Sequence, residues 1–234
     1  MHNTKLFDSK ESVPDISKSI GIELDSGFIR DNSRPFKHPK DKTIFMQGEP
    51  SHSVFFLSKG LVRVSKINYD GRKFTLDIIS PDDFFGEFSL CGEKERRLSA
   101  ETVEDSSGFE MDAAVLEGYL KKRPDVAIKM LQIIGDKRLE METMLERMVF
   151  MDVKERVVSL LLRYSDNNGV MKIPFTHQEM ADMTGATRVS VSRAIIELRK
   201  KNLIETNGER IRLSDINGLE ELVHRAEDIA LALI

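Results

Sequence analysis

The chain has 234 residues, of which 40% are hydrophobic and 32% are charged, and its formal net charge is −4. This is the composition of an ordinary globular protein, and no apolar run approaches the ~20 residues that cross a bilayer. The single Cys91 excludes an intramolecular disulfide, and it excludes an iron–sulfur cluster held within one chain, which needs four thiolates.

Residues 1–35 are polar and weakly patterned, and we interpret them as an N-terminal arm with one short helix near residues 14–23. The opening stretch MHNTKLFDSKESVPD lacks the basic segment followed by an apolar segment that marks a secretion signal. We therefore expect a cytoplasmic protein with no membrane partner.

Residues 36–123 are predicted to form a β-roll. Short segments rich in β-branched and aromatic residues follow one another, separated by glycines or turn pairs. These segments are residues 43–47, 54–60, 61–67 and 73–79. Between the last two, Asn68–Gly71 indicates a tight hairpin, because an Asp-Gly pair tolerates positive φ. Many short strands at this spacing favour a small barrel or roll.

A long helix is predicted to begin at Pro124, because proline is favoured in the first turn of a helix. From there, apolar residues recur at alternating steps of four and three, which is the repeat of a two-stranded coiled coil. This seam consists of Ala127, Leu131, Ile134, Arg138, Met141, Leu145 and Met148. We expect a homodimer through the helix over residues 124–151. The alternative is that the seam packs only against the chain's own roll.

Arg138 is the one polar member of the seam. Three interpretations are open. Arg138 sets the register of a dimer, it binds an anion, or it extends outward and pairs with Glu142 four residues on.

The segment after the long helix begins with Asp152, which is predicted to cap a helix over residues 153–164. Residues 166–169, with the sequence Asp-Asn-Asn-Gly, are predicted to form a turn, and Val170–Pro174 a strand. At the other end of this region, residues 215–234 form a last amphipathic segment, which either packs on the same domain or supplements the dimer.

Residues 176–201 have the pattern of a helix-turn-helix. Thr176 and Glu179 form the capping box of a helix over residues 178–183. A short turn containing Gly185 follows, and a second helix over residues 187–200 begins directly after it.

Residues 202–213 have the pattern of a strand, an Asn-Gly turn and a strand, which predicts a hairpin wing. The net charge of the whole chain argues against a nucleic-acid binder, but residues 174–212 hold seven Lys or Arg against five Asp or Glu, a net charge of +2. We therefore predict a regulator that binds double-stranded DNA. The sequence has no phosphate-binding glycine loop, metal-spaced cluster or nucleophile elbow, so we do not expect an enzyme.

The second helix of the motif is expected to read the DNA. Its apolar face consists of Val191, Ala194, Ile195 and Leu198. Because the N-terminal residues of such a helix point at base edges, Arg188 and Arg193 are the candidates for bidentate contacts with guanine O6 and N7. The candidates for positioning phosphates are Ser190, Ser192, Thr176 and the backbone of His177 and Gln178.

The order of roll, long helix and winged helix-turn-helix resembles the catabolite activator/fumarate–nitrate regulator (Crp/Fnr) family over about residues 36–213. The matching stretches are Phe84–Leu90, Pro124–Asp125, Phe150–Val153 and Thr187–Arg193. The resemblance implies an α+β fold in three parts after the arm. These parts are a β-roll (a double-stranded β-helix, cupin-like) over 36–123, a dimerisation helix over 124–151, and a winged helix-turn-helix domain over 152–234.

The recognition helix departs from the cAMP-binding members of the family, where it begins Arg-Glu-Thr-Val-Gly-Arg. Val189 stands at the position of the Glu, and a carboxylate there accepts a hydrogen bond from cytosine N4, whereas valine can only contact a thymine methyl group. The Arg-Val pair resembles the cyanobacterial nitrogen-control regulators, which recognise GTA…TAC half-sites. The resemblance implies a palindrome read by two helices about 34 Å apart, with half-sites other than TGTGA.

The family's phosphate cassette is Gly-Glu followed by Arg-Ser-Ala. Gly86 and Glu87 are present, but the second part is Arg97–Ala100 with one extra residue, and a one-residue shift turns a strand side chain to the other face. The two hydroxyl residues that meet the adenine align with Met141 and Glu142. Gly86 and Glu87 then either belong to an altered site or have a purely structural role.

A pocket between roll and long helix would hold a basic set of side chains, which suggests a small anionic effector rather than a fixed cofactor or metal. The candidate effector residues are Gly86, Glu87, Arg96, Arg97, Ser99, Lys137, Arg138 and Glu142. In the nitrogen-control regulators, a basic residue and a glutamate at the positions of Lys137 and Glu142 bind 2-oxoglutarate. The open alternatives are cAMP, haem held by His38 or His52, and no effector, with control by the amount of protein.

The turn over residues 166–169 lies where activators of the family contact RNA polymerase. The resemblance therefore implies a transcription activator with RNA polymerase as a further partner.

Overall fold

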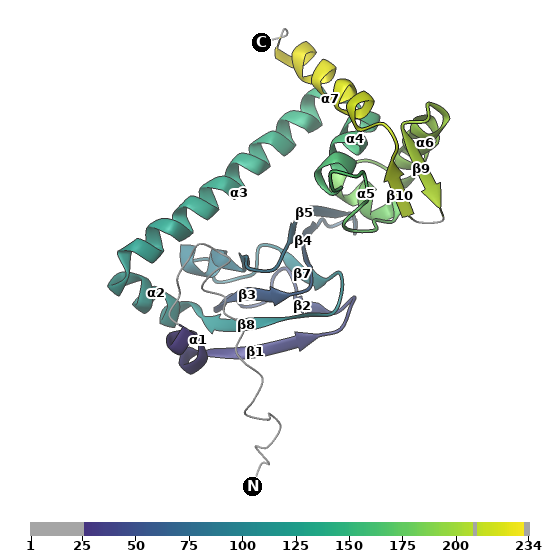
Figure 1. Cartoon of the computed structure of the whole chain (residues 1–234). Helices are drawn as coiled ribbons and strands as arrows, with labels where there is room; N and C mark the ends of the chain where they lie inside the picture. Colours follow the sequence, from purple (N-terminus) through teal and green to yellow (C-terminus); the bar gives the residue numbers. More distant parts are fainter. Residues whose placement is uncertain (1–25, 208–209, 232–234) are drawn as a thin grey trace. The chain divides into compact units, whose positions relative to one another are not determined.

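The structure is a computed structural model that describes residues 26–207 and 210–231. The predicted helix near residues 14–23 and the tip of the wing at 208–209 lie outside the described residues. The chain divides into two compact units, one made of the described residues up to 64 and residues 77–134, the other of residues 65–76 and 135 onward. Figure 1 labels the helices and strands of both units.

The first unit is built on two four-stranded antiparallel sheets, although parts of β4 and β5 in the second sheet belong to residues 65–76 of the other unit. The first sheet has the order β1 (Ser33–His38), β8 (Ser106–Asp112), β3 (Ser53–Lys59), β6 (Phe84–Phe85). The second has the order β2 (Thr43–Phe45), β7 (Ser99–Thr102), β4 (Val62–Ile67), β5 (Lys73–Ile79). The short helices are α1 (Ser26–Asn32), the 3-10 helix η2 (Glu87–Cys91) and α2 (Ala113–Lys122). The predicted roll is confirmed, although strand β1 and helix α1 begin inside the segment that we interpreted as an arm.

Strand β3 divides the core of the roll, because successive side chains of a strand point to opposite faces. Val54 and Phe56 belong to one buried cluster, while Phe55 and Leu57 belong to another. All four side chains are buried, so this strand is covered on both faces. The predicted hairpin at Asn68 is also present, since its side-chain oxygen accepts hydrogen bonds from the backbone N–H groups of two residues in the turn.

Helix α3 (Pro124–Phe150) is one continuous helix that begins at the predicted proline (Figure 1). Its first part packs on the roll through Val126 and Met130, with Ile134 half-buried against the same cluster. Of the seam residues, Ile134 is therefore at least partly buried by the chain's own roll, as the alternative to a dimer seam predicts. Leu131 and Leu145 are 68% and 59% exposed in the single chain, so these seam positions need another partner to be buried.

The second unit contains the helix-turn-helix and its wing. Its elements are α4 (Val153–Arg163), α5 (His177–Thr184), α6 (Arg188–Lys200), β9 (Ile204–Asn207), β10 (Arg210–Leu213) and α7 (Ile216–Leu231). Asp152 caps α4 as predicted, in a capping box with Glu155. The predicted strand over Val170–Pro174 is wrong. In this segment only Val170 and Met171 form isolated β-bridges, and no continuous ladder follows them. Pro174 also has no N–H with which to continue a ladder.

Candidate nucleic-acid interface

Local capping signals fix where both helices of the motif begin and end. The Thr176 hydroxyl accepts from Glu179 N at 3.2 Å, and the Glu179 carboxylate accepts from Thr176 N at 2.8 Å. Helix α5 ends at Gly185, whose φ of 63° is a left-handed conformation that glycine adopts without steric cost. Thr187 then caps α6 by accepting from Ser190 N at 3.1 Å. The turn between the helices is therefore short and closely defined.

The recognition helix α6 has one buried and one exposed face. The four residues predicted to be apolar contacts, Val191, Ala194, Ile195 and Leu198, are all buried. Arg188, Val189 and Arg193 are exposed, so each predicted base-reading side chain is available to a groove. Ile196 is also 44% exposed on this helix, which the sequence analysis missed. The helical period does place it off the buried face, because the spacing i, i+3, i+4, i+7 of Val191, Ala194, Ile195 and Leu198 does not include it.

The predicted phosphate-positioning side chains make hydrogen bonds within the motif. The Nδ1 atom of His177 lies 2.8 Å from the Ser192 hydroxyl, which joins α5 to α6. The hydroxyls of Ser190 and Thr187 are 2.9 Å apart, and Gln178 donates to Asp182 at 2.8 Å. These contacts hold the side chains in place at the N-terminal ends of the two helices. The caps take the backbone N–H groups of Glu179 and Ser190, while those of His177 and Gln178 lie in the first turn of α5, where a helix N-terminus favours a phosphate.

The one carboxylate in the middle of α6, Glu197, faces two cations. Lys154 on α4 lies 3.2 Å from it and Lys201 lies 3.5 Å from it. The hydrogen bond from Lys154 lowers the pKa of Glu197, and the same bond raises the pKa of Lys154. The stabilisation from Glu197 is present above the pKa of an unfolded glutamate and is lost as the pH falls through the lowered value. At neutral pH the pair cancels a charge that would repel DNA.

The wing adds basic side chains that were not among the predicted contacts. Arg210 and Arg212 of β10 are exposed and pair in register with Asn207 and Glu205 of β9. Together with Arg199 they line a groove of about 770 Å³ beside the end of the recognition helix. All three arginines contribute to the net charge of +2 over residues 174–212. That Arg199 lies beside the wing follows only from the fold.

The candidate effector residues of the roll have well-defined places. Arg96 is buried, and its guanidinium donates to Ser53 O at 2.8 Å and to the Ser53 hydroxyl at 2.9 Å. It also lies 4.2 Å from the centre of the Phe45 ring. A Cβ added to Gly86 would come within 2.7 Å of Nη1 of Arg96, and Gly86 has a φ of 80°. Gly86 therefore leaves room for this buried guanidinium.

Burial lowers the pKa of Arg96, and the surrounding carboxylates of Glu110, Glu49 and Glu87 oppose this shift. Among the described residues, its Nε is buried without a hydrogen-bond partner. Arg97 is instead exposed and forms an ion pair with Glu93.

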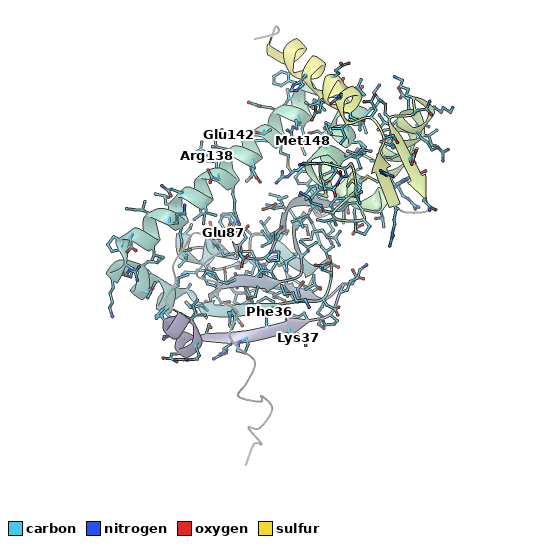
Figure 2. All side chains as sticks on the ribbon, viewed as in Figure 1. Phe36, Lys37, Glu87, Arg138, Glu142 and Met148 are labelled. Atoms are coloured by element: carbon cyan, nitrogen blue, oxygen red, sulfur yellow. The ribbon has the colours of Figure 1, made fainter. Side chains whose placement is uncertain are left out.

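The remaining candidates divide between the two units. Ser99 is buried, and its hydroxyl accepts from Gln47 N at 2.9 Å. On α3, Lys137 is half-buried, whereas Arg138 and Glu142 form an exposed ion pair at 3.2 Å (Figure 2). The interpretation in which Arg138 pairs with the residue four positions on is thus the one that the structure supports.

Other ligands have little support in the described part of the chain. No group of three or more His, Cys, Asp or Glu side chains is placed there to hold a metal ion. His38 stacks on Phe36 at 5.7 Å between ring centres, and His52 is exposed in the loop before β3. None of the described helices is long and apolar enough to span a bilayer.

Comparison with known proteins supports both units. The sequence pattern of the Crp-like helix-turn-helix domain matches residues 155–222, and that of the cyclic nucleotide-binding domain matches residues 35–123. The chain is 31% identical to a global nitrogen regulator of Synechocystis, over 74% of this chain and 80% of that one. It is 28% identical to a CRP-like cAMP-activated global transcriptional regulator of Mycobacterium tuberculosis, over 82% of this chain and 88% of the other.

Among solved structures, FixK2 from Bradyrhizobium japonicum matches with a TM-score of 0.72 and 27% identity, over 81% of this chain and 96% of that one. Members of this family are transcription regulators rather than enzymes. The capped helix-turn-helix, the roll and the relatives agree, and the chain belongs to the Crp/Fnr family of DNA-binding transcription regulators.

Proposed function

We propose that the protein acts as a cytoplasmic homodimer, joined through the helix over residues 124–151, that binds a palindromic DNA site and activates transcription. The observation that carries this proposal is the exposed face of α6. Arg188, Val189 and Arg193 are exposed there, while the apolar face of the same helix is buried. Each protomer would place this face in the major groove of one half-site, with the two helices about 34 Å apart. In this proposal the chain has four parts. These are an arm over residues 1–35, a roll over 36–123, a dimer helix over 124–151 and a DNA-binding domain over 152–234.

Base reading is assigned to Arg188 and Arg193, and phosphate positioning to Thr176, Ser190, Ser192 and the backbone of His177 and Gln178. Two features support this division. The arginines are exposed and long enough to reach base edges, whereas the hydroxyls are held close to the helix ends by short hydrogen bonds.

Val189 is 60% exposed, and it is expected to set the base preference at one position of each half-site. In Val189→Glu, the new carboxylate can accept from cytosine N4, which valine cannot do. Selection from a randomised duplex pool with this variant should therefore favour C at a position where the original protein favours T, by about 1–3 kcal/mol. An unchanged base at every position would contradict the assignment, while Ile196→Glu, farther along α6, serves as the matched control.

The turn over residues 166–169 is proposed to contact RNA polymerase. Asp166 holds the turn by accepting from Asn168 N and Val170 N, and Asn167 and Asn168 are exposed at its tip. Replacing Asn167 and Asn168 by alanine should reduce activated transcription at least severalfold in a purified system and leave the Kd for the site unchanged. If transcription and DNA binding fall together, this proposal fails.

Gating by a small anionic effector is the proposed mode of control. The candidate effector residues are Gly86, Glu87, Arg96, Arg97, Ser99, Lys137, Arg138 and Glu142. A second candidate is control by abundance, and one observation favours it. The Nη atoms of Arg96 donate to Ser53 and Gly86, and Arg97 forms an ion pair with Glu93, so the terminal nitrogens of both arginines already have partners. Titrating the dimer with 2-oxoglutarate and with cAMP, with DNA affinity as the readout, separates the two.

A further inference from the structure

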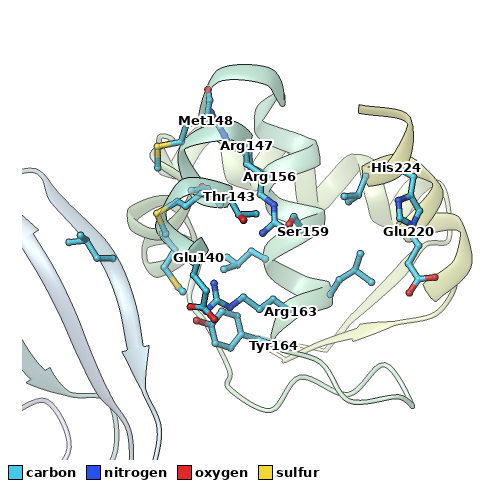
Figure 3. A pocket seen from close by; sticks show the side chains of 17 residues that line it. Glu140, Thr143, Arg147, Met148, Arg156, Ser159, Arg163, Tyr164, Glu220 and His224 are labelled. Carbon is cyan, nitrogen blue, oxygen red and sulfur yellow. The ribbon is translucent and has the colours of Figure 1, made fainter. Parts of the chain in front are cut away.

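A cavity of about 500 Å³ lies within the second unit, where the chain turns from α3 into α4 (Figure 3). Its wall on α3 consists of Glu140, Thr143, Met144 and Arg147. Its wall on α4 consists of Arg156, Ser159, Leu160 and Arg163. Both sets have the spacing i, i+3, i+4, i+7, which places the members of each set on one face of their helix. The cavity is thus a slot between two facing helix surfaces.

Contacts between the helices close both ends of the slot. Near the turn, Arg156 donates from Nη1 to Met148 O at 3.0 Å. At the far end, Arg163 donates to the Glu140 carboxylate at 2.7 Å. Figure 3 shows the side chains of Thr143, Arg156 and Ser159 projecting into the space between these two contacts. Hydroxyl and guanidinium groups therefore meet there within a lining that is otherwise largely apolar, with Met144, Leu160 and Met183 among its members.

The chemistry of this lining favours an anion. Arg163 and Glu140 neutralise each other, and Arg156 brings a further guanidinium to the lining. The Nε of Arg156 is buried and has no hydrogen-bond partner among the described residues. A buried donor without a partner has lost its hydrogen bonds to water, and a ligand oxygen would replace them. Guanidinium groups bind carboxylate and phosphate oxygens with two donors at once.

The slot also stays open in the proposed dimer. An α-helix turns by about 100° per residue, so Glu140, Thr143 and Arg147 lie roughly opposite Arg138, Met141 and Leu145 on α3. A partner helix packed on Arg138, Met141 and Leu145 would therefore cover the other side of α3, whereas the last seam residue, Met148, itself lines the slot.

We propose that this slot binds the carboxylate or phosphate group of a small molecule, with Arg156 as the main donor and the hydroxyl of Ser159 as a further contact. The Thr143 hydroxyl donates to Leu139 O at 3.0 Å, so Thr143 only borders the slot. Because α3 and α4 form its two walls, the ligand fixes the angle between the long helix and the helices that carry the DNA-reading motif. This regulatory consequence rests on the proposed function, whereas binding itself does not.

Isothermal titration of the full chain with inorganic phosphate, and separately with glutarate, tests the site without DNA. We expect one of the two probes to bind at one site per chain, which also identifies the ligand group. Thr143→Met fills the slot without changing a charge, and Arg156→Met removes the donor; each should weaken binding at least tenfold. Arg34→Met, which removes an exposed guanidinium from β1, is the control and should leave binding unchanged.

Thermal melting checks that each variant folds, and Thr143→Met carries the test if Arg156→Met does not. The proposal is overturned if neither probe binds, or if folded Thr143→Met binds as tightly as the original chain. In a second step, the probe should change the Kd for the palindromic site in the original protein and not in Thr143→Met. If the palindrome itself is not bound, only the regulatory step fails, and the titration result stands.

Discussion

Replacing Arg193 by alanine is expected to weaken binding to the selected palindrome by about 2–6 kcal/mol, or at least about 30-fold in Kd. A bidentate contact with guanine is worth about 1–3 kcal/mol of discrimination, and a symmetric dimer loses two of them. The side chain is exposed on α6 and is not part of the buried face of that helix. Fluorescence anisotropy at fixed salt with a labelled duplex measures the effect.

The comparison with a scrambled duplex distinguishes base reading from charge. Removing a base contact reduces affinity for the palindrome much more than for the scrambled duplex, whereas removing a phosphate contact weakens both nearly equally. Lys200→Ala, one cation fewer at the end of the same helix, is the matched control. Equal losses of Arg193→Ala on both duplexes would show that this arginine only contacts the backbone.

The second large effect concerns the dimer. Leu145→Glu is expected to convert the protein from dimer to monomer at micromolar concentration, because symmetry would bring two carboxylates into one apolar seam. Leu145 is 59% exposed in the single chain, so the substitution leaves the fold of each unit intact. Light scattering coupled to size-exclusion chromatography gives the mass directly.

Leu139→Glu provides the control for this prediction. Leu139 is also exposed on α3, but it lies about a third of a turn away from Leu145 around the helix. This variant should remain dimeric. A dimeric Leu145→Glu would mean that the seam is not the interface, and the exposed Leu131 and Leu145 would then need a different explanation.

Features that depend on nearby residues could be predicted from the sequence. The capping boxes at Asp152 and Thr176 each need only a glutamate three residues on, so both helix starts are confirmed. The buried face of α6 follows from the 3.6-residue period alone. The strand over 170–174 was predicted on the same kind of local pattern, but a strand also needs a continuous partner, which this segment lacks.

Features that depend on distant residues could not be predicted. The burial of Arg96 requires Ser53, which is 43 residues away, and a gap above Gly86 that only the folded roll creates. The contact of His177 with Ser192 spans 15 residues and two helices. The slot beside α3 has no sequence motif, because its lining comes from separate helices that only the fold brings together.

The most direct test of the central claim is selection by the purified full chain from a randomised duplex pool at stated salt. The account predicts a two-fold symmetric site whose half-sites are about one helical turn apart, with guanine at the positions read by arginine and no cytosine preference opposite Val189. A site without two-fold symmetry, or TGTGA half-sites, would contradict it.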